Sequence, residues 1–301
     1  MRLLLTGASG FLGSAVGKRL AESGHELRVL GRRVPPWLPA GSGFHRWDAM
    51  TGAAPVEALD GVDAVLHLAG EPVAQRWTKT VKRRIQRSRV EGTRALVEAI
   101  SRLEARPKMM VAASAIGYYG DRGDEDLTEE SGAGAGFLAE VCAAWEQETL
   151  KAAELGLRVS RVRFGVVLGR KGGALAKMLP AFRAGLGGPI GKGRQWMSWI
   201  HVADAVGMLK FILETPGVGG AWNATAPMAV RNAEFSRALG RAVRRPAVVP
   251  VPRFALRMMF GEMATMLTGG QRVRPAAALE AGYRFKFPEL EAALKDLLIT
   301  R

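Results

Sequence analysis

The sequence predicts an α/β fold, in which a doubly wound parallel sheet is followed by a smaller C-terminal α+β lobe. Short apolar runs alternate with longer helical patterns through the first half of the chain, and these runs contain few polar residues. Such runs are typical of parallel strands that are covered by helices on both faces. Strands that alternate with helices indicate right-handed crossovers and therefore one parallel sheet.

Residues 1–170 are expected to form the domain built on this sheet. Gly24 and Gly156 stand where helix C-caps belong, each at the end of a helical pattern. The predicted strands are 2–6, 26–30, 63–69, 108–114 and 157–165, and the predicted helices lie near 11–23, 78–103 and 136–155.

The pattern changes after residue 170, and residues 171–301 are expected to form mainly the smaller lobe. A helical pattern at 201–214 precedes a strand-like run at 220–225, and we expect this unit to return to the main sheet. Later elements are an apolar run at 248–252, a Met-rich helix at 253–268 and a final helix at 288–299. Because methionine fills irregular apolar gaps, we interpret four residues as core or lobe-interface residues: Met258, Met259, Met263 and Met266.

The composition indicates a soluble globular protein. Of the 301 residues, 48% are hydrophobic and 24% are charged. No apolar run reaches the roughly 18 residues of a membrane span, and the N-terminus lacks the pattern of a signal peptide. The single cysteine, Cys142, excludes an internal disulfide, and the four histidines lack metal-ligand spacing. We therefore expect a cytoplasmic protein with no metal and no membrane partner.

The net charge of +15 raises the question of nucleic-acid binding. The densest basic run, residues 79–94, contains no aromatic residue on which bases would stack. At helical spacing, Val81, Ile85, Ser88 and Gly92 share one side of this run, while most basic residues fall elsewhere. We interpret the run as a solvated helix face and expect no nucleic-acid partner.

A glycine triplet with steps of three residues follows the first predicted strand. Between a strand and a helix, such glycines permit a sharp turn, the approach of a pyrophosphate and close helix packing. The N–H groups and the dipole of the following helix favour an anion. The alternative is a tight turn without a ligand. We predict a dinucleotide-binding Rossmann domain in which these residues bind the cofactor: Gly7, Ser9, Gly10, Phe11, Leu12 and Gly13.

The end of the second predicted strand indicates which dinucleotide is bound. A domain that prefers NAD places an acidic residue there, on the ribose 2′-hydroxyl. This chain has Gly31, Arg32 and Arg33 instead. Two guanidinium groups suit a 2′-phosphate, and no carboxylate is present to repel it. We predict that Arg32 and Arg33 bind NADP; the alternative is that both arginines only face solvent.

Six short motifs are spread over the first two thirds of the chain: TGASGFLG (6–13), WDA (47–49), HLAG (67–70), SAIGYYGD (114–121), RVRFGVVLG (161–169) and WMSWIHVADAV (196–206). Together they resemble the motifs of the extended short-chain dehydrogenase/reductases, a family that includes nucleotide-sugar epimerases. The tail at 270–294 is similar to that of an atypical subgroup of epimerase family proteins. The resemblance covers essentially the whole chain.

The resemblance also implies six further cofactor-binding residues. Each has an alternative role, because a carboxylate also caps turns and small residues also make room for backbone. They are Asp48 at the adenine, Leu68, Ala69 and Gly70 near the adenosine ribose, and Gly165 and Val166 at the nicotinamide end.

The catalytic pattern of the family is incomplete in this chain. The resemblance implies a Ser or Thr together with Tyr-x-x-x-Lys, whose lysine lowers the pKa of the tyrosine and binds the nicotinamide ribose. In the helix expected to carry the pair, one register offers Phe137 and Val141, and the other offers Leu138 and Cys142. Neither register provides a proton-transfer pair.

Three residues remain as catalytic candidates: Ser114, Tyr118 and Tyr119. Ser114 lies one residue before the position that aligns with the family's serine; alternatively, its hydroxyl bonds to backbone at the strand end. The two tyrosines are alternatively packing residues. Other polar candidates for a substrate pocket are Glu71, Arg76, Arg194, Gln195, Trp196, Trp199 and His201.

We therefore expect an NADP(H)-binding oxidoreductase or epimerase that acts on a small polar or nucleotide-linked molecule. The alternative is a non-catalytic NADP(H) sensor or scaffold, which the missing Tyr–Lys pair favours. We expect a monomer or a weak homodimer, because a two-fold axis through the helices 78–103 and 136–155 would bring basic helices together.

Overall fold

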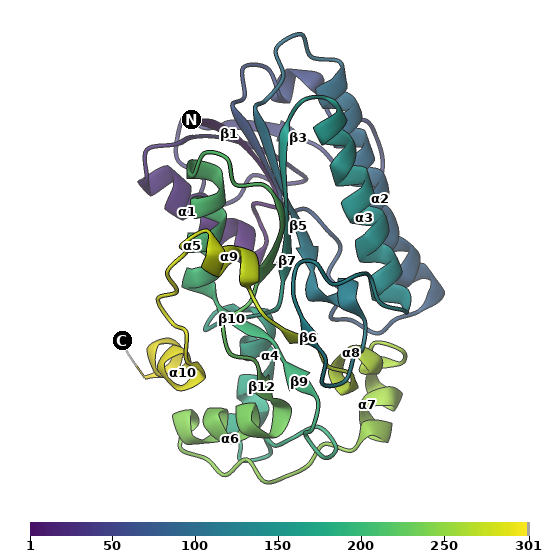
Figure 1. Ribbon diagram of the computed structural model, residues 1–301, viewed down its shortest axis with the longest axis vertical. Helices are drawn as coiled ribbons and strands as arrows, with labels where there is room; N and C mark the ends of the chain where they lie inside the picture. Colours follow the sequence, from purple (N-terminus) through teal and green to yellow (C-terminus); the bar gives the residue numbers. More distant parts are fainter. Residues whose placement is uncertain (300–301) are drawn as a thin grey trace.

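A seven-stranded parallel sheet forms the centre of the protein in the computed structural model, which describes residues 1–299 (Figure 1). The strand order is β11-β7-β5-β4-β1-β2-β3, and all neighbouring strands are parallel. This topology confirms the predicted doubly wound fold. The strands are β1 (Arg2–Thr6), β2 (Glu26–Gly31), β3 (Gly43–Arg46), β4 (Ala64–His67), β5 (Met109–Ala115), β7 (Arg158–Phe164) and β11 (Gly220–Ala224).

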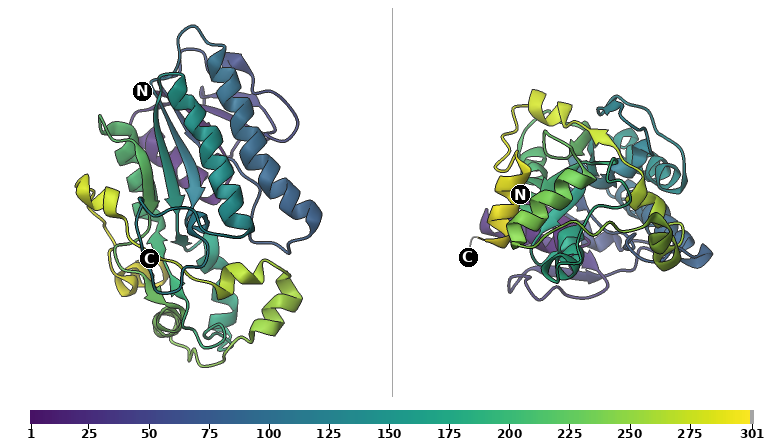
Figure 2. Two further views of the ribbon diagram at one scale, coloured as in Figure 1. Left: turned by 45° about the vertical axis from the view of Figure 1, so that its right-hand side comes forward. Right: turned by 90° about the horizontal axis from the view of Figure 1, so that it is seen from below.

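Four long helices cover the two faces of this sheet (Figures 1 and 2). On one face α1 (Phe11–Glu22) packs beside α5 (Val202–Glu214), and on the other α2 (Lys79–Ser101) packs beside α3 (Phe137–Glu154). Because both faces are covered, the strands are apolar on both sides. No helix within residues 1–299 is long and apolar enough to cross a membrane.

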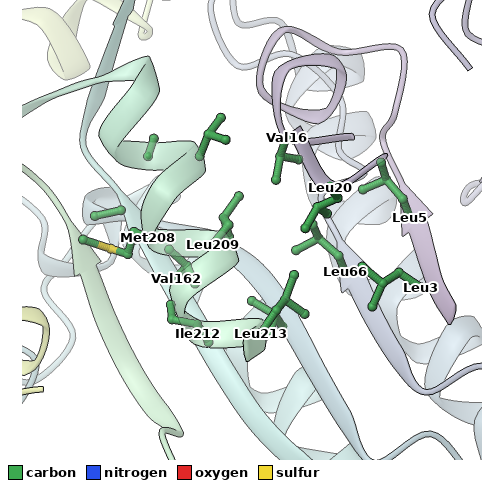
Figure 3. Packing of buried hydrophobic residues seen from close by; sticks show 14 of the residues in the cluster. Leu3, Leu5, Val16, Leu20, Leu66, Val162, Met208, Leu209, Ile212 and Leu213 are labelled. Carbon is green, nitrogen blue, oxygen red and sulfur yellow. The ribbon is translucent and has the colours of Figure 1, made fainter. Parts of the chain in front are cut away.

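Strand β1 contributes side chains to both hydrophobic layers. Leu3 and Leu5 belong to the core under α1 and α5, whereas Leu4 belongs to the core under α2, since successive residues of a strand point to opposite faces. Figure 3 shows Leu3 and Leu5 near Val16 and Leu20 of α1. All three leucines are fully buried, and each stabilises the fold by about 1.5–3 kcal/mol.

A smaller lobe lies beyond the carboxyl ends of the strands (Figure 1). One hydrophobic core joins three of its helices and includes Phe182, Phe235 and Leu294. Its elements are β8 (Val166–Gly169), α4 (Gly173–Arg183), β9 (Trp196–Met197), β10 (Trp199–His201), β12 (Val230–Arg231), α6 (Asn232–Val243), α7 (Arg253–Phe260), α8 (Ala264–Thr268) and α10 (Leu290–Leu298).

The Met-rich segment 253–268 differs from the predicted single, buried helix. It forms α7 and α8, which are separated at Gly261, where a φ of +63° does not continue a right-handed helix. Met263 is buried, as expected. The interpretation as core residues was wrong for the other three methionines, because these two short helices turn one side to solvent: Met258, Met259 and Met266 are exposed.

The C-terminal segment runs back from the smaller lobe to the main sheet. β13 (Arg272–Val273) pairs with β6 (Asp126–Leu127), and α9 (Ala276–Glu280) packs on β11. Further along, the carboxylate of Asp204 in α5 accepts hydrogen bonds from the backbone N–H groups of Lys286 (2.7 Å) and Phe287 (2.9 Å). The second half of the chain therefore builds part of the main domain as well as the smaller lobe.

Candidate cofactor site

The loop between β1 and α1 has a shape that two of its glycines dictate. Gly7 has a φ of +72°, and a Cβ added to it would lie 2.6 Å from the carbonyl carbon of Leu68. A Cβ added to Gly13 would lie 2.1 Å from the carbonyl oxygen of Gly7. Gly10 is exposed, and its added Cβ would meet only that same oxygen, at 3.2 Å. The backbone geometry of the loop thus requires glycine at positions 7 and 13. Gly10 is not required in this way, and its missing side chain leaves open space at the turn.

The N-terminus of α1 is open to an anion at this turn. Gly10 is its N-cap residue, no side chain caps the helix and the first turn carries no acidic residue. Ser9, just before the helix, is exposed. An uncapped N-terminus presents free N–H groups and the positive end of the helix dipole, so a pyrophosphate fits this loop.

The side chain of Phe11 packs onto the loop between β8 and α4. A Cβ added to Gly169 or Gly172 would lie 2.2 Å or 2.3 Å from an atom of the Phe11 ring, so only glycines fit around it. Leu12 likewise packs against the main core. Both side chains are half-buried against these neighbours, so we expect mainly the backbone of Phe11 and Leu12 to contact a cofactor.

Two arginines follow β2 beside this turn. Arg32 and Arg33 are exposed, and neither makes a hydrogen bond or an ion pair with the rest of residues 1–299. Trp37 anchors the loop after β2 to the glycine loop and α1. Its indole N–H donates to the carbonyl oxygen of Ala8 at 2.9 Å, and its ring packs on Gly17. Sequence analysis missed Trp37, although its position shortly after the arginines was visible.

Backbone contacts fix the end of β4 next to the glycine loop. The N–H groups of Leu68 and Ala69 donate to the Thr6 hydroxyl, both at 3.1 Å. Asp48, in the loop after β3, uses Oδ1 to accept the N–H of Met50 at 3.1 Å. Asp48 therefore caps a turn, the alternative raised from the sequence, while its Oδ2 makes no hydrogen bond within the described chain.

Gly165 and Val166 connect β7 to the smaller lobe. A Cβ added to Gly165 would lie 2.5 Å from the carbonyl oxygen of Ser198. The N–H of Gly165 donates to Ala224, and that of Val166 donates to Ser198. These contacts show that Gly165 makes room for backbone, which is the alternative role considered for it.

Ser114 is part of a buried ionic network. Its hydroxyl donates to Oε1 of Glu146 at 2.7 Å, and Ser114 itself is 3% exposed. Glu146 also accepts two hydrogen bonds from Arg163, both at 2.8 Å, and one from Arg161 at 3.1 Å. The network ties β5, α3 and β7 together. A hydroxyl held in this way is a structural group, so Ser114 does not suit the predicted catalytic role.

The two tyrosines after β5 have different surroundings. Tyr119 is fully buried; its hydroxyl donates to Asn223 at 2.7 Å and accepts from Arg163 at 2.8 Å. Burial raises the pKa of Tyr119, although Arg163 opposes this effect. Tyr119 therefore does not suit a general base. Tyr118 is half-buried, its ring lies under the guanidinium of Arg163 at 3.7 Å, and its hydroxyl has no hydrogen-bond partner among residues 1–299.

Comparison with known proteins places this arrangement in a family. The model of the NAD dependent epimerase/dehydratase family matches residues 3–224. The chain belongs to this family. A second model, described as a domain of unknown function (DUF1731), matches residues 251–297, which include the segment that returns to the main sheet.

Named relatives resemble the chain over its full length. Epimerase family protein YfhF of Bacillus subtilis is 37% identical over 100% of this chain and 99% of its own. The crystal structure of human epimerase family protein SDR39U1 with NADPH has a TM-score of 0.88, 37% identity and 99% coverage of both chains. MoeE5 in complex with UDP-glucuronic acid and NAD has a TM-score of 0.78 and 25% identity, with 99% of this chain and 98% of that chain covered.

In this member of the NAD dependent epimerase/dehydratase family, the positions considered for the Tyr–Lys pair lie on helix α3. Apolar residues or a cysteine stand there instead. Phe137 packs edge-to-face on Trp77, with ring centroids 5.1 Å apart. Val141 and Cys142 are buried. Burial raises the pKa of the Cys142 thiol to about 11, so the thiol is neutral at physiological pH. Arg89 of α2, which sequence analysis did not single out, lies beside Cys142.

The other polar candidates separate into structural residues and residues of a groove. His201 caps α5 by accepting the N–H of Ala203 at 3.0 Å, and Trp199 is buried. Glu71 is buried and pairs with Arg84 at 2.7 Å. Arg76 is exposed near the corner between α7 and α8. The remaining three, Arg194, Gln195 and Trp196, line one groove in the smaller lobe.

This groove has a volume of about 640 Å³ and carries more cations than acids. Three acidic residues also line it, and one of them, Asp124, pairs with Arg231 at 2.8 Å. The guanidinium of Arg231 stacks on Trp196, 3.8 Å from the ring centroid. The other four cations make no ion pair within the part of the chain that the structure describes. We call this the basic groove; its cations are Lys192, Arg194, Arg231, Arg237 and Arg253.

Proposed function

We propose that the protein binds NADP(H) and transfers hydride to or from a small anionic substrate that carries a phosphate or a nucleotide. The observation that carries the choice of cofactor is the pair of exposed, unpaired arginines directly after β2. A domain that prefers NAD has a carboxylate near this position, whereas Arg32 and Arg33 suit a 2′-phosphate. The NADPH in the structure of the human relative supports this choice.

The residues present fit this cofactor. The uncapped N-terminus of α1 would bind the pyrophosphate, Arg32 and Arg33 the 2′-phosphate, and the Oδ2 atom of Asp48 the adenine amino group. When bound, the cofactor supplies a hydride to a carbonyl carbon or accepts one from an alcohol. Tyr118 is the remaining candidate for the accompanying proton, because its hydroxyl is not engaged by the described chain. We expect slow turnover, since no lysine assists this phenol.

The basic groove supports the choice of substrate class. It is lined by five cations and three acids, and four of the cations are unpaired. An excess of unpaired Lys and Arg in a concave site favours phosphate groups. The complex of MoeE5 with UDP-glucuronic acid provides a precedent in a related fold.

Two measurements test the proposal. Dissociation constants for NADPH and NADH by calorimetry should show tighter binding of NADPH. Nucleotide sugars and small phosphorylated carbonyl compounds should then be screened with NADPH, and an Arg194→Ala/Arg253→Ala variant should lose affinity for any hit. Lys295→Ala, which lies outside the groove, serves as the control. Equal affinity for both cofactors would contradict the proposed cofactor preference.

A second candidate function is a non-catalytic protein that responds to NADP(H). The observation that favours it is that two of the three candidate hydroxyl groups already bind protein atoms: Ser114 donates to Glu146, and Tyr119 donates to Asn223. Of the three, only the Tyr118 hydroxyl has no hydrogen-bond partner within residues 1–299. A protein of this kind would bind NADPH tightly and consume none of it with any compound of the screen.

We further propose that the protein is a monomer or a weak homodimer. Arg83 and Arg87 are exposed on the outward face of α2. In a dimer formed through α2 and α3, this face would lie against the same face of the second copy, and the like charges would repel each other. Light scattering after size exclusion at low and high salt tests this point, because salt should favour any such dimer.

A further inference from the structure

Arg89 lies on the inward side of α2, between the end of β4 and helix α3. It follows the buried Ile85 by four residues and precedes the buried Gly92 by three, so it shares their side of the helix. Its guanidinium lies over the Trp145 ring of α3, 5.1 Å from the centroid. A Cβ added to Gly70 would lie 3.2 Å from both Cζ and Nη2 of Arg89. The guanidinium therefore borders Gly70, which the family resemblance places near the adenosine ribose. It also lies beside Cys142, one of the two positions considered for the lysine that holds the nicotinamide ribose.

Protein atoms accept hydrogen bonds from only one of the three nitrogens of this guanidinium. Nη1 donates to the carbonyl oxygens of Glu71 at 3.0 Å and of Ile85 at 3.2 Å. Nε and Nη2 have no hydrogen-bond partner within residues 1–299. The side chain forms no ion pair there either, because the carboxylate of Glu71 is paired with Arg84 instead. Arg89 is thus oriented by neutral carbonyls, while two of its three nitrogens remain available.

The neighbouring groups do not neutralise the charge of Arg89. The thiol of Cys142 is protonated at physiological pH, since burial raises its pKa to about 11. Burial lowers the pKa of Arg89, an effect that Cys142 and Glu71 only partly oppose. A partly buried cation without an ionised partner is costly unless a ligand supplies acceptors. A cofactor bound beside the glycine loop and the end of β4 would supply such acceptors.

We propose that Arg89 binds the nicotinamide ribose and its phosphate in NADP(H), through Nε and Nη2. This inference rests on the NADP(H) binding proposed above. Arg89 reaches the neighbourhood of Cys142, one of the two positions considered for the family's lysine, from the adjacent helix. An arginine stays protonated in proteins and donates through a planar fork. It therefore replaces the lysine in holding the ribose and does not replace it in proton transfer.

The test compares two ligands that differ in the nicotinamide half. NADPH contains it, whereas adenosine 2′,5′-bisphosphate has the 2′-phosphate but no nicotinamide ribose. In Arg89→Met, the Kd for NADPH should rise about tenfold or more, and the Kd for the bisphosphate should change less than about twofold. Arg89→Lys should recover part of the loss, because it keeps the charge and loses the fork. The fluorescence of bound NADPH should change in Arg89→Met, since the nicotinamide is held less firmly.

Arg87→Met is the matched control, because Arg87 is an exposed arginine on the same helix that pairs with Glu91 at 2.8 Å. It should leave both dissociation constants unchanged. Unchanged NADPH affinity in a folded Arg89→Met variant overturns the inference. An equal loss for both ligands also overturns it, because it would mean that Arg89 only supports the surrounding structure. If Arg89→Met does not fold, Arg89→Lys gives the same comparison. If the unmodified protein binds neither ligand, the proposed function itself fails.

Discussion

The arginine side chains of this molecule differ in whether they bind other groups of the protein. Arg163 is buried and makes hydrogen bonds with Glu146 and Tyr119, so it belongs to the framework. Arg32 and Arg33 are exposed and unpaired directly after β2. Surface substitutions of groups that bind nothing else in the protein change stability little, so the removal of these two charges should affect a ligand and leave the fold intact.

The Arg32→Ala/Arg33→Ala variant should therefore bind NADPH about tenfold or more weakly and NADH almost as well as before, because only the 2′-phosphate loses its partners. Calorimetry with both cofactors measures the effect. Arg19→Ala is the control, since Arg19 is also exposed but lies on α1 in a weak pair with Glu22. A preference for NADPH that survives in the double variant would assign the 2′-phosphate to other residues.

His67 gives a prediction for pH. It is fully buried between Thr6 and Thr93, and burial lowers its pKa to about 4. The unfolded chain takes up the proton near pH 6.5, whereas the folded protein does so only near pH 4. Stability due to this residue is therefore complete above pH 6.5 and falls as the pH drops toward 4, by up to about 3 kcal/mol.

The measurement is urea unfolding between pH 7 and pH 4.5. His67→Gln should show a smaller loss of stability over this range than the unmodified protein, although it is less stable at pH 7. His45→Gln, on β3, should keep the slope of the unmodified protein. The same slope in His67→Gln would show that another group titrates.

At the scale of elements, α3 shows both the power and the limit of sequence analysis. The absence of the Tyr–Lys pair was visible from Phe137, Val141, Leu138 and Cys142, because helical spacing fixes both registers. The role of Glu146 was not visible. It depends on β5 and β7 lying side by side, a pairing that brings Ser114 next to Arg163.

The same reasoning applies to other elements of the fold. Strongly apolar or periodic segments such as β1, α1 and α2 were predicted within two residues of their bounds. The short strand β3 and the helices α4 and α6 were not, because their hydrophobic patterns are brief or interrupted by Gly and Pro. Among the residues of the site, the loop at 7–13 could be predicted from the spacing of its glycines. Arg89 could not be predicted in this way, because its partners Gly70 and Trp145 come from other elements.

Glu146→Gln tests the network between β5, α3 and β7. The change leaves Arg163 buried without its carboxylate, so the free energy of unfolding should fall by about 3 kcal/mol or more. Thermal or urea unfolding measures the loss. Glu91→Gln removes an exposed carboxylate that pairs with Arg87 and should change stability by less than about 0.5 kcal/mol. A similar small change in Glu146→Gln would rule out a structural role for the network.

At the scale of the whole molecule, Asp204 links the C-terminal segment to the main domain. It is 2% exposed and accepts the backbone N–H groups of Lys286 and Phe287. Its neighbour Tyr283 donates its hydroxyl to the Asp204 carbonyl at 2.9 Å. These contacts attach the C-terminal segment to the start of α5.

Asp204→Ala should lower the free energy of unfolding by about 2–4 kcal/mol, because two buried N–H groups lose their acceptor. Hydrogen exchange should become faster over 283–298 and stay unchanged over 1–30. Asp60→Ala, an exposed position, is the control. Equal exchange along the C-terminal segment in both variants would mean that the segment is held elsewhere.

The return of the C-terminal segment has a consequence for biosynthesis. β6 emerges from the ribosome long before its partner β13, and α9 can pack on β11 only when the chain is almost complete. Synthesis proceeds at about 5–20 residues per second, so the stretch from β11 to α9 takes about 3–11 seconds to make. Such pairings across long stretches of sequence slow folding. A chain that ended before residue 270 would contain the cofactor loop and all seven strands of the main sheet, but β6 would lack its partner β13 and β11 would lack α9.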